Sequence, residues 1–430
     1  MKPFDQMDFI RKAYPLNRTL VSDDTDQMLE LIQTHLPGRF RPFYSIIRVP
    51  SDTSCWTWTA PKKYVVHEAY LEDGSGRRII DVNNHHLHLA SYSQPVDAIL
   101  TFNELEPHLH FSEQNPEAIP WKYLFYQQNW GFCLSKKQFD SLDKNQSYHA
   151  VIRSAFEDDA LKIGELVLRG RSETEALVIT DICHPMQVND SITGVSAVLD
   201  LLHQWQEKPN LTFRFLFLPE TIGSLCYFAA REKIAQNIRW AIFTEMLGND
   251  NSLALQYSFQ GDTYIDKMAE SVLSEIDPSL RTGPFRSFAG NDELVTNGPG
   301  LGIPTISITR SKKAFDCFPG YHTSDDTPDN LDPGKLAEGA EALHRLLKRI
   351  DADYRPKRLF KGPLFLSGCG LWGVWGGLEN GKEVVDQIML RMEGNLSVAE
   401  IALIIHQPFD VVKSITDAFV DKGFAERMDL

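Results

Sequence analysis

The chain has 430 residues, of which 43% are hydrophobic and 23% are charged, and its formal net charge is −15 at pH 7. This length and composition predict a soluble globular protein with more than one domain. The negative charge argues against a nucleic-acid partner, because phosphate recognition depends on Lys and Arg. No stretch approaches the roughly 20 apolar residues of a membrane helix, and the N-terminus lacks the apolar core of a signal peptide. We therefore expect a cytoplasmic protein with no membrane partner, and its six cysteines, which form no CxxC pair, are expected to be reduced and mostly buried.

The first predicted element is a helix that begins near Asp24 and ends before Pro37. Its apolar residues recur at helical spacing: Met28, Leu31, Ile32 and Leu36. Asp24 is the expected cap, because its side chain can accept a hydrogen bond from a free backbone N–H group of the first turn.

The sequence pattern changes after this helix, and we expect residues 41–161 to form an inserted, mainly β domain. Short β-prone runs there alternate with turn signals such as 73–76. His86 and His88 lie two residues apart on a strand-like segment and so share a face. No acid stands at a matching spacing, so a packed or solvent-facing pair is favoured over a second metal site. Aromatic residues from Trp121 to Trp130 are interpreted as core, with the mouth of a pocket as the alternative.

Beyond residue 163 the expected strands and helices alternate. The expected strands are 176–182, 211–218, 240–244 and 303–309. The expected helices are 190–205, 223–234, 263–276 and 333–350. Alternation of this kind predicts an α/β fold with a mostly parallel sheet sandwiched by helices. We assign residues 1–40 and 162–360 to this domain.

The last portion contains three short helical patterns, at 383–392, 397–406 and 408–422. They predict a winged-helix module over residues 365–430. Residues 381–430 contain five Lys or Arg and nine Asp or Glu, a balance of −4. A DNA-binding module is normally basic, so we favour a protein partner, self-association or a substrate lid. The glycines between 368 and 377 follow no strand and precede no lysine, so we interpret that stretch as a linker.

Histidines and acids stand where the expected strands end. His184 and Asp190 follow the first strand, Glu220 follows the second, Glu245 follows the third, and His322 comes later. In an open α/β sheet ligands collect outside the carboxyl ends of the strands, so these side chains are expected to converge. A hydrolytic zinc site needs His, Asp or Glu ligands, an open position for water and a nearby carboxylate base. We predict Glu220 as the base. The predicted metal ligands are His184, Asp190, Glu245 and His322.

The residues stand in motifs that resemble those of the co-catalytic zinc aminopeptidases, which include bacterial leucyl aminopeptidase and have glutaminyl cyclases as relatives. The motifs are His184, Asn189-Asp190-Ser191-Ile192-Thr193-Gly194, Pro219-Glu220-Thr221-Ile222-Gly223-Ser224, Thr244-Glu245-Met246-Leu247-Gly248 and the late His322. With an inserted β domain and a winged-helix end, the chain is still more similar to a bacterial family of aminopeptidase-like proteins. The strings 91–97, 130–134 and 321–326 look typical of that family.

The resemblance implies a role for each residue and one or two zinc ions. Asp190 would bridge two metals, Glu245 and His322 would complete one shell, His184 would serve the other, and Glu220 would be the general base. These enzymes have a second glutamate, itself a ligand, where this chain has Thr221, and a neutral hydroxyl is a poorer zinc ligand than a carboxylate. A site with a single zinc ion is therefore an alternative to a site with two. The single ion would be held by Asp190 and His322 with either Glu245 or His184.

Three further residues are candidates for substrate binding. Asp292 is expected to bind a substrate amine or to replace the missing ligand, and a loop carboxylate in solvent is the alternative. Glu293 has the same status. Arg310 follows the strand 303–309 and is a candidate clamp for a substrate carboxylate, with an internal ion pair as the alternative.

The sequence therefore predicts a zinc-dependent aminopeptidase-like hydrolase, a metalloprotease that cleaves an amide next to a free amino group in a small peptide or peptide-like metabolite. An alternative is a catalytically degenerate protein that binds metal and ligand and acts through protein contacts of its acidic winged-helix module. The balance of −4 over residues 381–430 speaks against a third hypothesis, a transcription factor with a sensory domain.

Overall fold

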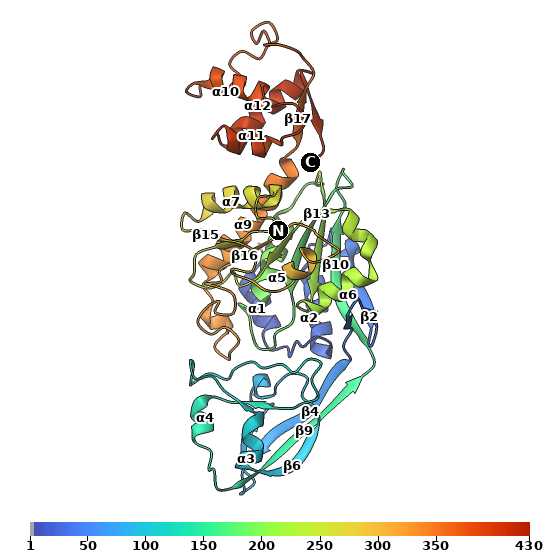
Figure 1. The fold of residues 1–430 in the computed structure, drawn as a ribbon, viewed down its shortest axis with the longest axis vertical. Helices are drawn as coiled ribbons and strands as arrows, with labels where there is room; N and C mark the ends of the chain where they lie inside the picture. The colour runs from blue at the N-terminus through green and yellow to red at the C-terminus, as the bar shows by residue number, and fades with distance from the viewer. Residues whose placement is uncertain (1–3) are drawn as a thin grey trace. The chain divides into compact units, whose positions relative to one another are not determined.

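The computed structural model describes residues 4–430, and the chain divides into two compact units (Figure 1). The larger unit comprises residues up to 208 together with 212–344, and the smaller unit comprises 209–211 and 345–430. No helix within residues 4–430 combines the length and the apolar character needed to cross a membrane.

An eight-stranded mixed sheet forms the centre of the larger unit, in the order β1-β10-β12-β11-β13-β16-β14-β15. The strands are β1 Tyr44–Pro50, β10 Ala160–Leu168, β11 Glu175–Asp181, β12 Thr212–Leu218, β13 Ile238–Thr244, β14 Ala254–Gln256, β15 Arg281–Gly283 and β16 Thr305–Thr309. The four middle strands β12, β11, β13 and β16 are parallel. They are almost entirely buried, as expected of parallel strands covered on both faces. The antiparallel pairs lie toward the two edges, at β1, β10 and β14.

Helices flank this sheet (Figure 1). The helices of four or more residues that begin in the larger unit are α1 Gln6–Ala13, α2 Asp23–His35, α3 Phe102–Leu105, α4 Lys136–Asp140, α5 Ile192–Gln204, α6 Ile222–Ala230, α7 Tyr264–Ile276, α8 Glu293–Thr296 and α9 Pro333–Ala352. The predicted α/β fold class is confirmed, and the strands and helices expected beyond residue 163 are found within a few residues of their predicted bounds.

The N-terminal helices differ from the prediction. A helix over Gln6–Ala13 precedes the expected one. The cap of α2 is Ser22, whose Oγ accepts a hydrogen bond from Thr25 N at 3.1 Å. Asp24 instead lies inside the first turn, where its carboxylate accepts from Asn17 N. A carboxylate in the first turn still interacts favourably with the positive end of the helix dipole, and the sequence signal of Asp24 was therefore one of charge rather than of capping.

Between β1 and β10 the chain forms a four-stranded antiparallel sheet in the order β5-β4-β9-β6, seen at the bottom of Figure 1. Its strands and the shorter pairs nearby are β2 Ser54–Cys55, β3 Trp58–Thr59, β4 Lys63–Glu72, β5 Arg78–Asp81, β6 Val96–Thr101, β7 Leu109–His110, β8 Phe132–Cys133 and β9 Ser147–Glu157. The expected strand at the histidines is wrong, because His86–His88 is a turn of 3-10 helix whose His88 Nδ1 lies 2.8 Å from Cys133 O. Neither His86 nor His88 belongs to a potential metal-binding group among the described residues.

One hydrophobic core joins the two sheets of the larger unit. It contains Tyr148 and Ile152 of β9 together with Leu216 of β12 and Phe243 of β13, all of them buried. Because buried apolar area is the main favourable term in folding, the inserted sheet and the α/β part stabilise each other.

The smaller unit is a helical module with one β pair. Its elements are α10 Gly381–Met389, α11 Val398–Ile404, α12 Phe409–Asp421, β17 Arg355–Arg358 and β18 Ala425–Met428, and the two strands pair antiparallel. Ser397 and Glu400 form a capping box at the start of α11, a local signal that fixes a helix start in sequence.

Candidate metal centre

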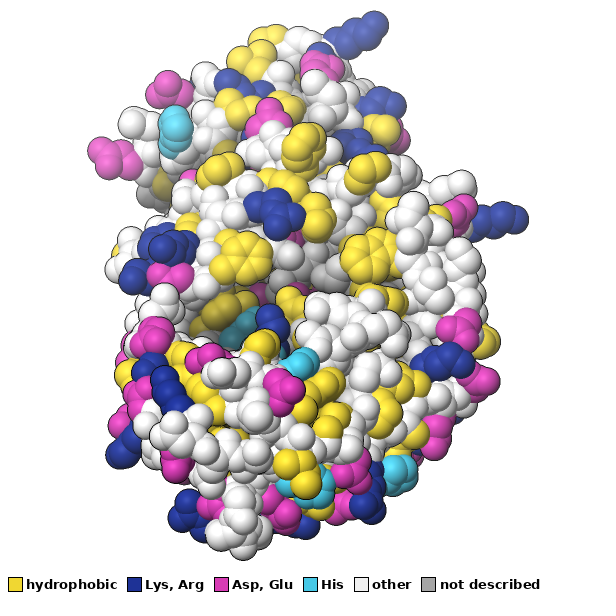
Figure 2. Space-filling view, turned by 60° about the horizontal axis from the view of Figure 1, so that its bottom comes forward, with side chains coloured by type: hydrophobic (Ala, Val, Ile, Leu, Met, Phe, Trp, Pro, Cys, Tyr) yellow, Lys and Arg dark blue, Asp and Glu magenta, His cyan; other side chains and the backbone are white. Residues whose placement is uncertain are grey.

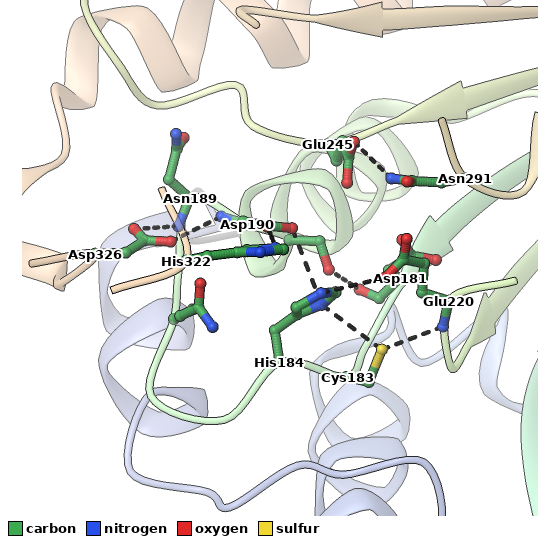
Figure 3. A network of polar contacts seen from close by, with 12 residues as sticks. Asp181, Cys183, His184, Asn189, Asp190, Glu220, Glu245, Asn291, His322 and Asp326 are labelled. Carbon is green, nitrogen blue, oxygen red and sulfur yellow. Dashed lines mark hydrogen bonds and ion pairs between the residues drawn. The ribbon is translucent and has the colours of Figure 1, made fainter. Parts of the chain in front are cut away.

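Each predicted metal-site residue lies just beyond a strand or in a loop at the same edge of the central sheet (Figure 3). His184 and Asp190 lie in the turn from β11 to α5, Glu220 lies between β12 and α6, and Glu245 directly follows β13. His322 lies in the segment between β16 and α9. These strands are parallel, so their carboxyl ends share one edge.

Asp190 lies between the two histidines. His322 Nε2 is 3.0 Å from Asp190 Oδ2, and His184 Nδ1 is 4.0 Å from Asp190 Oδ1. His184 Nε2 is 3.2 Å from Glu220 Oε2. The structure therefore brings together four of the five residues singled out by the sequence, although His184 and His322 are 138 positions apart (322 − 184).

Glu245 lies beside this cluster. Its Oε1 accepts a hydrogen bond from Asn291 Nδ2 at 2.8 Å, and its buried Oε2 has no hydrogen-bond partner within residues 4–430. Figure 3 shows this second oxygen directed toward the space above Asp190 and His184. A buried carboxylate oxygen without a donor is costly, so the position suits a ligand that the polypeptide itself does not supply.

Two groups of side chains place their ligand atoms within 4.8 Å of one another: His184 with Asp190 and His322, and His184 with Cys183 and Glu220. Imidazole, carboxylate and thiolate are the donors that zinc prefers in proteins. Together with the unpartnered oxygen of Glu245, this donor set fits a divalent cation. Cys183 was missed as a potential ligand; its Sγ accepts from Glu220 N at 3.2 Å, and its position next to His184 was the available signal.

Negative charge exceeds positive charge in the cluster. Burial raises the pKa of Glu245 well above its ordinary value, and the nearby charges of Asp190 and Glu220 add to the effect. Burial likewise raises the pKa of Asp181, which faces Asp292. Burial alone would lower the pKa of His184, but the charge of Asp190 raises it well above the usual value. A cation bound here would relieve the repulsion among these acids.

Arg18 organises the turn that carries His184, and no pattern in the sequence indicates this role. The side chain is fully buried, and burial lowers its pKa to about 10. Its guanidinium donates at 2.6 to 3.2 Å to four backbone oxygens, those of Ile182, Cys183, His184 and Gln187. A rigid fork with several donors can fix several carbonyls at once, so Arg18 determines the path of this turn.

The backbone is left-handed at several of the turns that carry the site. The φ angles are +83° at His184, +58° at Thr221, +53° at Met246 and +55° at His322. Residues other than glycine adopt this region at a cost, and such positions gather at functional sites. The concentration of four of them around one cluster supports a functional interpretation of this edge.

A close helix-to-strand approach at Gly194 holds Asp190 near Glu245. A Cβ atom at Gly194 in α5 would lie 2.2 Å from Thr244 O and 2.6 Å from Thr180 Oγ1. Only glycine allows this contact. The start of α5 is therefore packed directly against the carboxyl ends of β11 and β13.

Trp121, from the stretch between β1 and β10, covers the two histidines. Its ring centroid lies 4.3 Å from that of His184 and 4.7 Å from that of His322, and its backbone N donates to His322 O at 2.7 Å. Tyr321 stacks on His322 from another side at 3.9 Å. Figure 2 shows a hollowed face with histidine and acidic side chains among hydrophobic ones. Aromatic walls of this kind exclude water and strengthen electrostatic interactions inside a site.

Asp292 and Glu293 are not solvent-facing loop acids, since both are fully buried. Asp292 accepts hydrogen bonds from Thr221 N at 3.2 Å and from Ser224 Oγ, and burial raises its pKa to about 6. Glu293 accepts from Asn291 N and Gln256 Nε2. Asp292 thus fixes the turn after Glu220.

Arg310 lies in an internal network instead of facing a substrate, because its side chain is completely buried. Its guanidinium forms an ion pair with Glu338 at 2.6 Å and donates to the backbone oxygens of Leu247 and Asn251. The expectation of a substrate clamp is therefore corrected to the internal ion pair. A residue at a strand exit was a weak signal, since side chains at that position can turn inward as readily as outward.

A family model described as "Domain of unknown function (DUF4910)" matches residues 7–353. The chain belongs to this family. A Clostridium acetobutylicum relative, described as a candidate polysaccharide biosynthesis protein with an aminopeptidase-like domain, is 32% identical over 343 residues. That match covers 80% of this chain and 76% of the relative.

Solved structures extend the comparison. The crystal structure of a candidate peptidase from Clostridium acetobutylicum superposes with a TM-score of 0.85 and 28% identity, covering 98% of this chain and 96% of the other. A zinc aminopeptidase from Bacillus subtilis superposes with a TM-score of 0.59 and 12% identity, covering 81% and 95%. An aminopeptidase from Aneurinibacillus sp. strain AM-1 gives 0.52 and 15%, covering 80% and 92%. This member of the DUF4910 family therefore has a peptidase-like fold similar to that of zinc aminopeptidases.

Proposed function

We propose that the protein is a zinc-dependent aminopeptidase-like hydrolase that cleaves an amide next to a free amino group in a small peptide or peptide-like metabolite. The observation that carries the proposal is the convergence of His184, Asp190 and His322, with Glu220 beside them, at the carboxyl edge of the sheet. The peptidase-like fold supports it, because ligands bind at this edge in open α/β sheets.

Asp190, His184, His322 and Glu245 are the proposed ligands of the metal. A bound zinc ion would supply Lewis acidity, polarising the amide carbonyl and making a water molecule nucleophilic at neutral pH. Asp190 is suited to a central role, because it lies against both imidazoles and its backbone N is fixed by Asp326 at 3.0 Å. Rigid support of this kind keeps ligands in place before the metal arrives.

Glu220 is the proposed general base. Its side chain is 27% exposed, whereas that of Asp190 is 4% exposed. A proton carrier must reach both the attacking water and the leaving nitrogen, so the partly exposed acid is the better candidate. In this role Glu220 takes a proton from the water and passes it to the leaving amine.

We propose one tightly bound zinc ion per chain. Thr221 stands where the zinc aminopeptidases supply a second glutamate, and its backbone N–H is bonded to Asp292. The neutral hydroxyl of Thr221 offers little to a second cation.

The test combines metal content with turnover. Elemental mass spectrometry of the purified chain is expected to find close to one zinc ion per chain. Glu220→Gln is expected to retain that zinc and to lose turnover by roughly 10²- to 10⁴-fold. Glu207→Gln, an exposed acid outside the site, is the matched control with unchanged turnover. Full activity of Glu220→Gln would reject the assignment of the base, and a zinc-free protein would reject the metal centre.

The substrate panel should include aminoacyl amides, dipeptides and amides of amino sugars. The last class enters because the Clostridium relative is described as a candidate polysaccharide biosynthesis protein. We also propose that the protein acts in the cytoplasm.

Thr221 favours one further candidate function, that of a degenerate enzyme. In this case the centre binds metal and an amino-terminal ligand, and the acidic C-terminal module engages a protein partner. The same panel separates the two: zinc-loaded protein that binds aminoacyl amides but hydrolyses none supports the degenerate enzyme.

A further inference from the structure

A cavity of about 810 Å³ lies beside Thr221, the residue that follows the proposed base. Its walls come from the β2–β3 hairpin with Trp56 and Trp58, from Leu225 in α6 and from the segment 294–301. The volume lies within the range of small-molecule sites in proteins. The cavity is separate from the groups of metal-ligating atoms described above, which contain none of these wall residues.

The walls of the cavity are mainly apolar, and Glu232 and Gln236 add polar groups to them. Trp56 and Trp58 are 41% and 43% exposed, and together they form an exposed apolar patch of the kind that marks interaction sites. Trp56 Nε1 donates to Glu232 Oε1 at 2.8 Å, so the polar edge of this ring already has its partner. Trp58 packs edge-on against Tyr126, with ring centroids 5.9 Å apart. Both indoles are therefore held in place and offer apolar surface at low entropic cost.

The position of the cavity indicates which end of a substrate reaches it. In the proposed function Glu220 passes its proton to the leaving nitrogen, so the leaving amine lies beside Glu220. Thr221 is the next residue along the chain and forms part of the cavity wall. A substituent on the leaving amine that runs from Glu220 past Thr221 would reach the cavity wall that contains Trp58.

We propose that this cavity binds an apolar, ring-bearing substituent on the leaving amine of the substrate. The proposal rests on the proposed function, because the direction of the leaving amine is taken from the role of Glu220. It makes Trp56 and Trp58 selectivity-determining residues.

The test uses two substrates with the same aminoacyl part, leucinamide and leucine 2-naphthylamide. Trp58→Ala is expected to lower kcat/KM for the naphthylamide by roughly tenfold and to leave that for leucinamide within about twofold. Leu294→Ala shortens another side chain of the cavity wall and should give the same pattern, and Trp58→Phe should restore most of the loss. Trp372→Ala, an exposed indole of the smaller unit, is the matched control. Equal losses on both substrates, or no loss on either, would overturn the proposal.

A binding measurement separates this proposal from the proposed function. Titration of the full chain with 2-naphthylamine, followed by calorimetry, reports on the cavity without turnover. Binding that Trp58→Ala weakens, in a protein that hydrolyses no amide, keeps the cavity as an amine site and rejects the hydrolase. Turnover without binding of 2-naphthylamine keeps the hydrolase and rejects the cavity.

An independent observation concerns two cysteines at the base of the same hairpin. Cys55 in β2 and Cys226 in α6 are 171 positions apart in the chain, and their Sγ atoms lie 3.0 Å from each other. Both side chains are buried, with 1% and 0% exposed. Two thiols this close can be joined with little movement of the backbone.

We infer that Cys55 and Cys226 form a disulfide when the chain meets a disulfide oxidant such as oxidised glutathione. One thiolate attacks the glutathione disulfide and releases reduced glutathione, and the second thiol then displaces the other glutathione. The two cysteines lose two protons and two electrons in all, and one oxidised glutathione becomes two reduced ones. The bond would tie the hairpin that carries Trp56 and Trp58 to the helix that follows Glu220.

Counting thiols tests the bond. The full chain is incubated for hours with oxidised or reduced glutathione, because buried thiols exchange slowly, and is then unfolded and labelled with N-ethylmaleimide. Since the chain has six cysteines, intact mass is expected to show six labels on the reduced chain and two fewer on the oxidised chain, and peptide mapping should link positions 55 and 226. Cys55→Ser should abolish the difference, and Cys317→Ser should retain it. Six labels after oxidation, or a bond between other cysteines, would reject the inference.

Discussion

Two buried clusters of charge in the larger unit differ in how their charges are balanced. Near one edge of the sheet Arg214 makes two hydrogen bonds to Glu175 at 2.8 and 3.0 Å and pairs with Glu165 at 2.5 Å. Arg231 also reaches Glu165, at 3.1 Å. At the carboxyl edge Asp190 and Glu220 form their ion pairs with imidazoles, while the guanidinium of Arg18 donates to backbone oxygens.

The difference shows which cluster has its charges balanced by side chains of the protein itself. Arg214 and its acids satisfy one another, which is the arrangement that makes a buried ion pair tolerable. The carboxyl-edge cluster keeps an unpartnered oxygen on Glu245 and a strongly raised pKa on Asp181. We interpret the first cluster as structural and the second as one that an external cation completes.

Removal of Arg214 should have the largest effect on stability. Arg214→Met leaves the buried carboxylates of Glu165 and Glu175 without their main partner, and we expect a loss of about 3–5 kcal/mol in the free energy of unfolding. Urea denaturation measures it. Zinc content should stay unchanged, and a chain that loses its zinc would show that the two clusters are not independent.

Zinc should stabilise the chain through the other cluster. At a free zinc concentration of 100 times the Kd, linkage predicts a gain of about 2.7 kcal/mol in the free energy of unfolding. We expect Asp190→Asn to abolish the gain and Asp97→Asn, an acid on β6 in the other sheet, to retain it. Thermal unfolding with and without a chelator measures the effect, and identical transitions would contradict a metal centre.

The free energy of unfolding of the metal-free chain should depend on pH partly through the protonation of Glu293. Burial raises the pKa of this acid from 4.5 to about 7, so the folded state holds the proton more tightly than the unfolded state. The resulting stabilisation is complete below pH 4.5 and is lost as the pH rises through 7. Its size is on the order of 3 kcal/mol, since the pKa rises by about 2.5 and one pKa unit corresponds to about 1.4 kcal/mol. Glu293→Gln should reduce the slope of the profile between these limits, while Asp326, whose pKa burial also raises to about 7, keeps its share. An unchanged profile would assign the dependence to other groups.

The ion pair of Arg153 and Glu68 should contribute least to the free energy of unfolding. Their atoms lie 2.9 Å apart, and the side chains are 61% and 31% exposed. An ion pair in contact with water contributes about 0–1 kcal/mol, so Arg153→Ala should scarcely move the urea midpoint. A loss of stability as large as that of Arg214→Met would contradict the expected difference between buried and exposed ion pairs.

Local patterns were sufficient for the elements and for much of the site. The apolar run before Glu220 and the run before Glu245 were recognised as strands because buried parallel strands are continuous in apolar residues. His184 and Asp190 were found because they follow such a run. The cap of α2 was assigned to Asp24 instead of Ser22, because both residue types favour helix starts and only the backbone path distinguishes them.

Long-range contacts lay beyond those patterns. Arg18 lies 164 positions before the first carbonyl it binds, and no local rule links an N-terminal arginine to that turn. Trp121 belongs to the inserted stretch, and nothing in its neighbours indicates that it covers two histidines of the α/β part. Arg310 was open to two interpretations, and its complete burial and its ion pair with Glu338 selected the internal one.

By itself the sequence determined the succession of strands and helices and the residue types at their ends, because these follow from hydrophobic periodicity and the chemistry of single side chains. The tertiary structure alone decided the distances: Asp190 between two imidazoles, Gly194 against Thr244, and an indole pair beside Thr221. Such distances depend on packing between segments far apart in the chain, 50 positions for Gly194 and Thr244 and 132 for Asp190 and His322, and the energy of that packing is shared among many small contacts. No short stretch of sequence contains it.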